Sequence, residues 1–93
     1  MNNHIDPYKD LKAKLEETTN FPTKYMFKFI IPSNDDKVKA IENIFNYIGA
    51  VIKSKKSKTG KFISFTILVK MNSADAIIEK YKEVSKIEGV ISL

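Results

Sequence analysis

The chain has 93 residues, of which 43% are hydrophobic and 29% are charged, and its formal net charge is +5. This length and composition favour one globular domain. Cysteine is missing from the sequence, which excludes disulfides, thiolate catalysis and thiol-ligated zinc. The N-terminus lacks the apolar core of a signal peptide, and no stretch reaches the ~20 apolar residues that span a bilayer. We therefore expect a cytoplasmic protein.

The positive charge raises nucleic acid as a possible partner. All sixteen basic residues are lysines, however, whereas arginine is the residue best suited to bidentate contacts with phosphate and guanine. The chain also contains thirteen isoleucines, so a general bias of composition explains much of the lysine content. Charge alone does not identify a partner.

Residues 1–20 are predicted to form a tail and an N-terminal helix, with Asp6 as N-cap and Pro7 at the first helical position. The helix has one narrow apolar stripe, formed by Tyr8, Leu11 and Leu15. A helix this short is marginal alone. It therefore either docks on the domain formed by residues 21–93 or frays.

Residues 24–31 alternate as a strand, with Tyr25, Phe27, Phe29 and Ile31 on the inner face. A helix over 35–48 follows, started by Ser33 in a capping-box-like pattern and ended by Gly49. A strand over 50–55, a turn over 57–60 and a strand over 61–71 come next. A second helix within 72–88, ended by Gly89, and a last strand over 90–93 complete the chain.

The two halves repeat when the chain is shifted by forty residues. Ser33 then falls on Ser73 and Gly49 on Gly89, and both predicted helices have the same length. Each half reads as strand, capped helix, glycine and strand. The sequence therefore predicts a ferredoxin-like βαββαβ domain, in which a four-stranded antiparallel sheet carries two helices on one face.

Two stretches, "FPTKYMFKFI" at 21–30 and "KSKTGKFISFTI" at 56–67, resemble the YbeD-like family of small bacterial proteins of unassigned function. The matching features are the Phe21-Pro22 pair, the aromatic strand, the Ser57–Ser64 hairpin and the terminal "GVISL" at 89–93. The resemblance covers about residues 11–93 and implies a fold similar to the ACT domains that regulate metabolic enzymes. One departure is Pro32, which stands where amino-acid-binding ACT domains have glycine. Because proline removes an N–H donor, it argues against amino-acid binding at that turn.

No catalytic constellation is visible, and we expect no enzyme, cofactor or metal site. His4 is the only histidine and lies in the predicted tail, so no Ser/His/Asp set can form. Asp35, Asp36 and Asp75 lie at predicted helix N-termini, where the helix dipole explains them. The pair Glu79 and Glu83 lacks further metal ligands.

An RNA-recognition module would have the same topology and would display two outward aromatics on its third strand. Phe62 and Phe65 are three residues apart, so they point to opposite faces of that strand. Only Phe62 remains for stacking on a base. This spacing argues against RNA recognition by the sheet.

The outward sheet face is predicted to carry an apolar patch formed by Met26, Ile30, Ile52, Phe62 and Leu68. Such a patch usually marks a contact site. Three covers are possible: the N-terminal helix, a second copy of the chain, or a partner protein. We expect partial cover by the helix and association through the rest.

Five lysines flank the predicted hairpin between the second and third strands: Lys53, Lys55, Lys56, Lys58 and Lys61. They keep the hairpin solvated and prevent unwanted strand pairing, or they contact an anionic partner. The expected function is a non-enzymatic, ACT-like regulatory or adaptor module that acts by protein association, with a small ligand as a further possibility. The alternative is a basic protein that associates with nucleic acid or the ribosome through the hairpin lysines.

Overall fold

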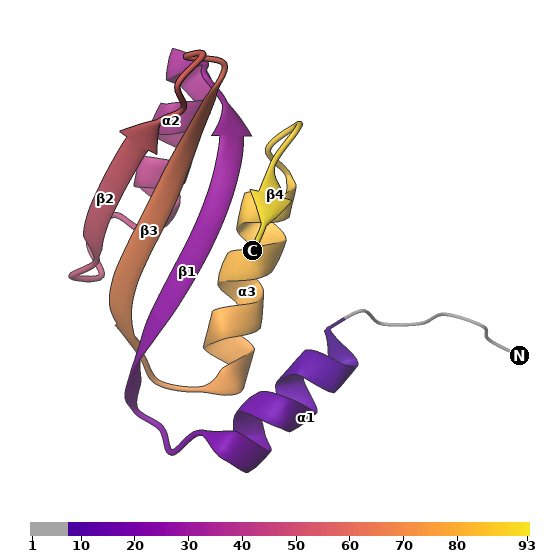
Figure 1. Ribbon diagram of the computed structural model, residues 1–93. Coiled ribbons are helices and arrows are strands. Elements are labelled where there is room, and N and C mark those ends of the chain that lie inside the picture. The colour runs from indigo at the N-terminus through magenta and orange to yellow at the C-terminus, as the bar shows by residue number, and fades with distance from the viewer. Residues whose placement is uncertain (1–7) are drawn as a thin grey trace, which may run out of the picture.

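The strands of the protein form one antiparallel sheet in the order β2-β3-β1-β4. A computed structural model describes residues 8–93. Its elements are α1 (Lys9–Thr18), β1 (Thr23–Pro32), α2 (Asp35–Ile44), β2 (Val51–Lys56), β3 (Phe62–Met71), α3 (Ala74–Ser85) and β4 (Ile91–Ser92). Both α2 and α3 lie on the same side of the sheet (Figure 1). The predicted ferredoxin-like βαββαβ fold is confirmed.

The two long central strands determine which face of the sheet is buried. β1 and β3 pair along their whole lengths, with Phe27 opposite Ile67 and Phe29 opposite Phe65. These side chains are almost completely buried against α2 and α3. Because side chains alternate along a strand, the even-numbered residues of β1 and β3 form the opposite, outer face. The inner face predicted for the first strand is confirmed.

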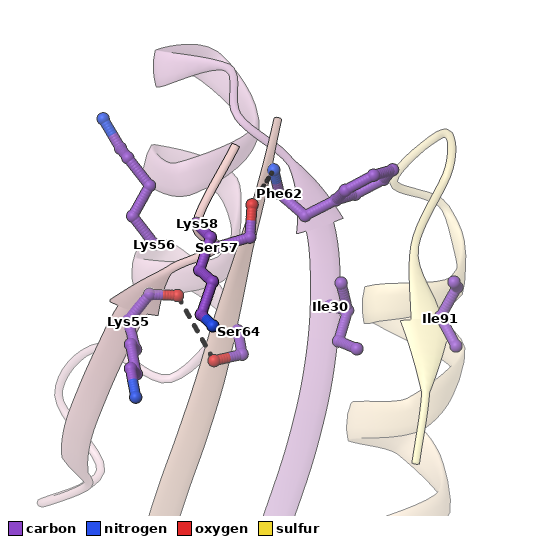
Figure 2. A pocket seen from close by; sticks show the side chains of 8 residues that line it. All are labelled: Ile30, Lys55, Lys56, Ser57, Lys58, Phe62, Ser64 and Ile91. Carbon is purple, nitrogen blue, oxygen red and sulfur yellow. Dashed lines mark hydrogen bonds between the residues drawn. The ribbon is translucent and has the colours of Figure 1, made fainter. Parts of the chain in front are cut away.

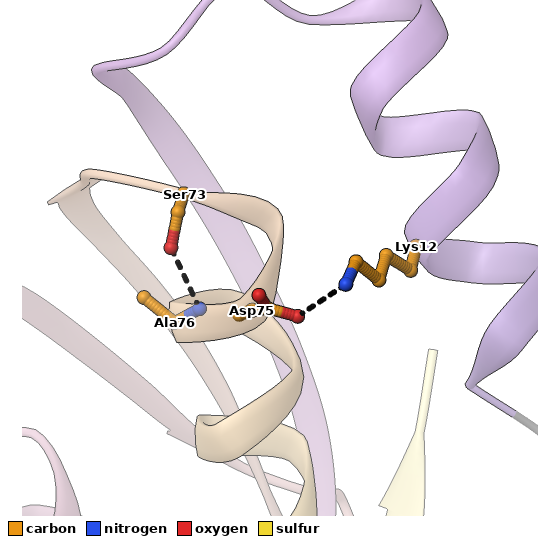
Figure 3. Close-up of polar contacts among 4 residues, drawn as sticks. All are labelled: Lys12, Ser73, Asp75 and Ala76. Carbon is orange, nitrogen blue, oxygen red and sulfur yellow. Dashed lines mark hydrogen bonds and ion pairs between the residues drawn. The ribbon is translucent and has the colours of Figure 1, made fainter.

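Each of the two sheet-covering helices begins at a side-chain cap. The Ser73 hydroxyl accepts a hydrogen bond from the backbone N–H of Ala76 at 3.0 Å, as predicted (Figure 3). The cap predicted for the first of them was wrong by one residue: Asn34, not Ser33, accepts from the N–H of Lys37 at 3.1 Å. Ser33 instead donates its backbone N–H to the carbonyl of Lys61 at 2.9 Å. Ser33 thus ties the chain to the residue that precedes β3, and α2 begins at Asp35, the residue predicted, with Asn34 as its cap.

The helix α2 ends at Ile44, four residues before the predicted end. Tyr47 adopts a φ of 64°, a left-handed conformation that interrupts the helix before Gly49, whose φ is 75°. The Lys80 ammonium from α3 donates to the Ile44 carbonyl at 2.7 Å and so satisfies one of the last carbonyls of α2. The two helices therefore differ in length, with 10 residues in α2 and 12 in α3, contrary to the predicted equality.

The N-terminal helix α1 contacts α3 and does not cover the outer face, so that part of the prediction was wrong. Leu15 is buried in the main core, and Lys12 forms an ion pair with Asp75 at 3.0 Å (Figure 3). The hydrogen bond to Asp75 raises the pKa of Lys12. The predicted cap Asp6, Pro7 and His4 lie outside the described residues. Since Leu15 belongs to the shared core, α1 packs onto the domain, while a boundary at residue 20 remains a prediction.

Candidate functional site

The outer face of the sheet carries apolar side chains that no other element covers within residues 8–93. Met26 lies directly opposite Leu68 across β1 and β3, and both are exposed. Ile30 lies opposite Ser64 on one side and opposite Ile91 of β4 on the other. Phe62, at the start of β3, is 44% exposed. Four of the five predicted patch residues therefore lie on this face.

The fifth predicted patch residue, Ile52, was placed on the wrong face. It pairs with Ile67, which is fully buried, and it packs partly buried against the core. Its neighbour Val51 pairs with Leu68 and is 56% exposed on the outer face. Val51 and Ile91 are thus apolar residues of this face that the sequence analysis missed. The alternation of β2 could not identify Val51, because two apolar residues stand side by side at its start.

The hairpin lysines divide among four positions. Lys53 and Lys55 pair with Thr66 and Ser64, so they belong to the outer face. Lys56 pairs with Ile63 at the end of β2, and Lys58 lies in the turn. Lys61 lies on the far side of the turn, where its carbonyl accepts from Ser33.

A groove of about 620 Å³ brings part of the apolar face together with part of the lysine cluster. We call it the hairpin groove. Figure 2 shows Phe62, Ile30 and Ile91 on one side and the β2–β3 hairpin on the other, with the Lys58 side chain directed toward Ser64. Its lining consists of Ile30, Lys55, Lys56, Ser57, Lys58, Phe62, Ser64 and Ile91. Met26, Val51, Leu68, Lys53 and Lys61 are not part of it.

Hydrogen bonds within the hairpin fix the lysine side of this groove. The Phe62 N–H donates to the Ser57 hydroxyl at 3.1 Å, and the Ser57 N–H donates to the Phe62 carbonyl at 2.8 Å. The Ser64 hydroxyl donates to the Lys55 carbonyl at 3.3 Å (Figure 2). Gly60 closes the turn at a φ of 75°, with its N–H donated to the Ser57 carbonyl at 2.9 Å. The turn residues therefore hold the lysine-bearing backbone in one position beside the apolar side chains.

Charge is unevenly distributed between the two layers. The segments 23–32 and 51–71, which contain the three long strands and the hairpin, carry eight lysines and no aspartate or glutamate. All the acidic residues that the structure describes lie on the three helices, except Glu88 just after α3. Both ion pairs found in residues 8–93, Lys12–Asp75 and Lys80–Glu83, join helix residues. The lysines of the sheet and hairpin have no carboxylate partner there.

The described part of the chain holds neither a cluster of metal ligands nor a membrane-spanning helix. Residues 8–93 contain no group of three or more His, Cys, Asp or Glu side chains placed to hold a metal ion. None of the helices in that range is long and apolar enough to cross a membrane.

Comparison with known proteins identifies relatives of this fold. None of the curated proteins compared with the chain matches it. The solution structure of protein HP0495 from H. pylori superimposes with a TM-score of 0.64 at 20% identity, covering 99% of this chain and 98% of that one. At this identity the similarity shows the fold alone. The model of a family described as "Protein of unknown function (DUF493)" matches residues 16–93, a range that includes the whole sheet, α2 and α3. The chain therefore belongs to this family, which is the small uncharacterised family that its motifs resemble.

Proposed function

We propose that the protein is a non-enzymatic regulatory or adaptor module that acts by associating with another protein through the outer face of its sheet. The observation that carries this proposal is the uncovered apolar surface on that face. Met26, Val51 and Ile91 are each at least half exposed. With their neighbours they form two exposed apolar clusters, which the row formed by Lys28, Thr66 and Lys53 separates. Exposed apolar clusters on a small domain often mark a contact site.

The resemblance of the fold to ACT domains, which regulate metabolic enzymes, favours a regulatory role. A ligand site at the end of β1 has less support, because Gly89 approaches the Pro32 ring closely there. Pro32 also offers no N–H to a ligand. Association through the sheet face is therefore favoured over amino-acid binding at this turn.

The alternative function, association with nucleic acid or the ribosome, draws on the unpaired hairpin lysines. Phe65 is buried, which leaves Phe62 as the one outward aromatic of β3. Recognition of single-stranded RNA by a sheet normally stacks two or three bases on aromatic side chains. One aromatic and no arginine give less support to this function than the apolar face gives to protein association.

Site-specific photo-crosslinking in the native cytoplasm tests the proposal. A photoreactive phenylalanine derivative replaces Leu68 on the outer face, and the control carries it at Glu79, an exposed position on α3. We expect discrete protein adducts from position 68 that are missing from position 79. Identical adducts at both positions, or adducts at neither, would overturn the proposed function.

A further inference from the structure

The hairpin groove joins an apolar surface and an uncompensated positive rim. Phe62, Ile30 and Ile91 supply the apolar surface, and Ile91 is 51% exposed. Lys55 and Lys58 flank it from the hairpin (Figure 2). A ligand that satisfies both parts must itself be apolar and negatively charged.

The charge distribution further restricts the chemical class of the ligand. The strands and hairpin carry lysines only, and none of these lysines is paired with a carboxylate in residues 8–93. Exposed lysines without partners attract anions over several ångströms and determine which partner approaches. Lysine binds carboxylates and phosphates alike as a point charge. The rim is therefore suited to an anionic group, and the apolar surface beside it determines which class of anion fits.

A second copy of the chain is a poor occupant. Face-to-face pairing of two outer faces would join two surfaces that each carry Lys28, Lys53 and Lys55 and no carboxylate. Like charges placed opposite each other at an interface are unfavourable. Nucleic acid would satisfy the lysines but would leave most of the apolar surface unused, since only Phe62 can stack on a base.

From this charge complementarity we propose that the hairpin groove binds an acidic segment of a partner protein. One aliphatic or aromatic side chain of the segment rests on Ile30, Phe62 and Ile91, and neighbouring carboxylates pair with Lys55 and Lys58. This inference rests on the proposed function and specifies the chemistry of the partner. It also predicts that binding weakens as salt is raised, because the lysines are exposed.

Selection from a library of short random peptides displayed on phage tests the chemistry directly. The full chain is the bait, and a variant carrying Lys55→Gln, Lys58→Gln and Phe62→Ser serves for counter-selection. We expect the enriched peptides to be acidic and to share one large apolar residue. Enrichment of neutral or basic peptides, or no enrichment that depends on the groove, would overturn the inference.

Fluorescence anisotropy on the most enriched peptide then assigns the contacts. We expect Lys55→Gln with Lys58→Gln to weaken binding about 3- to 10-fold, and Phe62→Ser or Ile91→Ser to weaken it about tenfold. The matched control, Lys39→Gln with Lys86→Gln, removes the same charge from exposed positions on the helical side and should leave affinity unchanged. Equal losses in both lysine pairs would show a nonspecific charge effect and refute the site. An amide NMR spectrum of each variant confirms that it is folded.

The failure of this inference can be told apart from the failure of the proposed function. Crosslinks at position 68 without selection of acidic peptides would leave an outer-face adaptor whose partner has a different chemistry. Groove-dependent binding of a single-stranded RNA probe tighter than that of any selected peptide would favour the nucleic-acid alternative. A concentration-dependent dimer that Phe62→Ser abolishes would identify the second copy as the occupant. Each of these results rejects an acidic segment.

Discussion

Gly89 lies between α3 and β4, at a φ of 84°, with its backbone close to the Pro32 ring. A Cβ atom added at this position would lie 2.9 Å from Pro32 Cγ and 3.2 Å from Pro32 Cδ. Both carbons belong to a ring at the end of the central strand β1, so neither can swing aside as a flexible side chain would. The substitution Gly89→Ala therefore combines backbone strain with a steric clash.

Gly49 separates these two contributions. It has a similar φ of 75°, but an added Cβ there would meet no atom within 4 Å. An L-residue in the left-handed region costs about 1–2 kcal/mol, and alanine recovers about 0.4–1 kcal/mol by restricting the unfolded chain. Gly49→Ala should thus lower the free energy of unfolding by about 1 kcal/mol. Overpacking costs a further 1–3 kcal/mol or so, which gives about 2–4 kcal/mol for Gly89→Ala.

Urea denaturation followed by circular dichroism measures both changes in a domain of this size. A double-mutant cycle with Pro32→Ala isolates the clash, because that variant lacks both ring carbons. In the Pro32→Ala background, Gly89→Ala should cost about as much as Gly49→Ala does alone, about 1 kcal/mol. Equal losses for the two glycines in the wild-type background, or a coupling energy near zero, would refute the reasoning.

Three other predictions concern contacts of the helices. Leu15→Ala should lower the free energy of unfolding by about 2–3 kcal/mol in urea, because Leu15 is only 7% exposed and belongs to the main core. Lys80→Met should cost about 1–2 kcal/mol in thermal unfolding, since it removes the donor to the Ile44 carbonyl but keeps the aliphatic stem. Burial, and then the hydrogen bond to Tyr25, raises the pKa of Tyr81 in the folded state. The unfolded chain therefore loses the Tyr81 proton at a lower pH than the folded protein does. The resulting stability is present below the ordinary tyrosine pKa of about 10 and is lost as pH rises above it. Tyr81→Phe should reduce this loss, which urea denaturation at several pH values measures.

Each of these predictions has a control at a comparable position. Lys12→Gln removes the exposed ion pair to Asp75 and should have no measurable effect, whereas a loss equal to that of Leu15→Ala would mean that charge holds α1 in place. Lys39→Met removes an exposed lysine of α2 and should leave thermal unfolding unchanged. For Tyr81→Phe the control is Tyr47→Phe, which removes the hydroxyl of an almost fully exposed tyrosine. An unaltered alkaline slope in Tyr81→Phe would contradict the assignment to Tyr81.

The fold could be predicted from sequence because the central strands alternate cleanly. In β1 every second residue from Tyr25 is large and apolar, and Lys28 marks the opposite face. A shift of one residue would have moved all the aromatics to the outer face, so pairing with β3 was strongly determined. The errors at Ser33 and at the end of α2 have local causes. The backbone N–H of Ser33 bonds to Lys61 and the cap falls on Asn34, while the left-handed Tyr47 prevents α2 from continuing to Gly49.

The candidate site was harder to predict because it depends on which strands are neighbours. In β2, Val51 and Ile52 are adjacent and the four residues that follow them are polar. Local sequence therefore does not determine whether Val51 or Ile52 points toward the core. Only the pairing of Ile52 with Ile67 does so, and β2 is an edge strand held by one neighbour. Ile91 reaches the outer face because β4 pairs with β1 at Ile30. The hairpin groove thus combines residues from β1, the β2–β3 hairpin and β4. Its lysines form part of a candidate site only because the fold brings Ile30 and Ile91, which are distant in sequence, next to the hairpin.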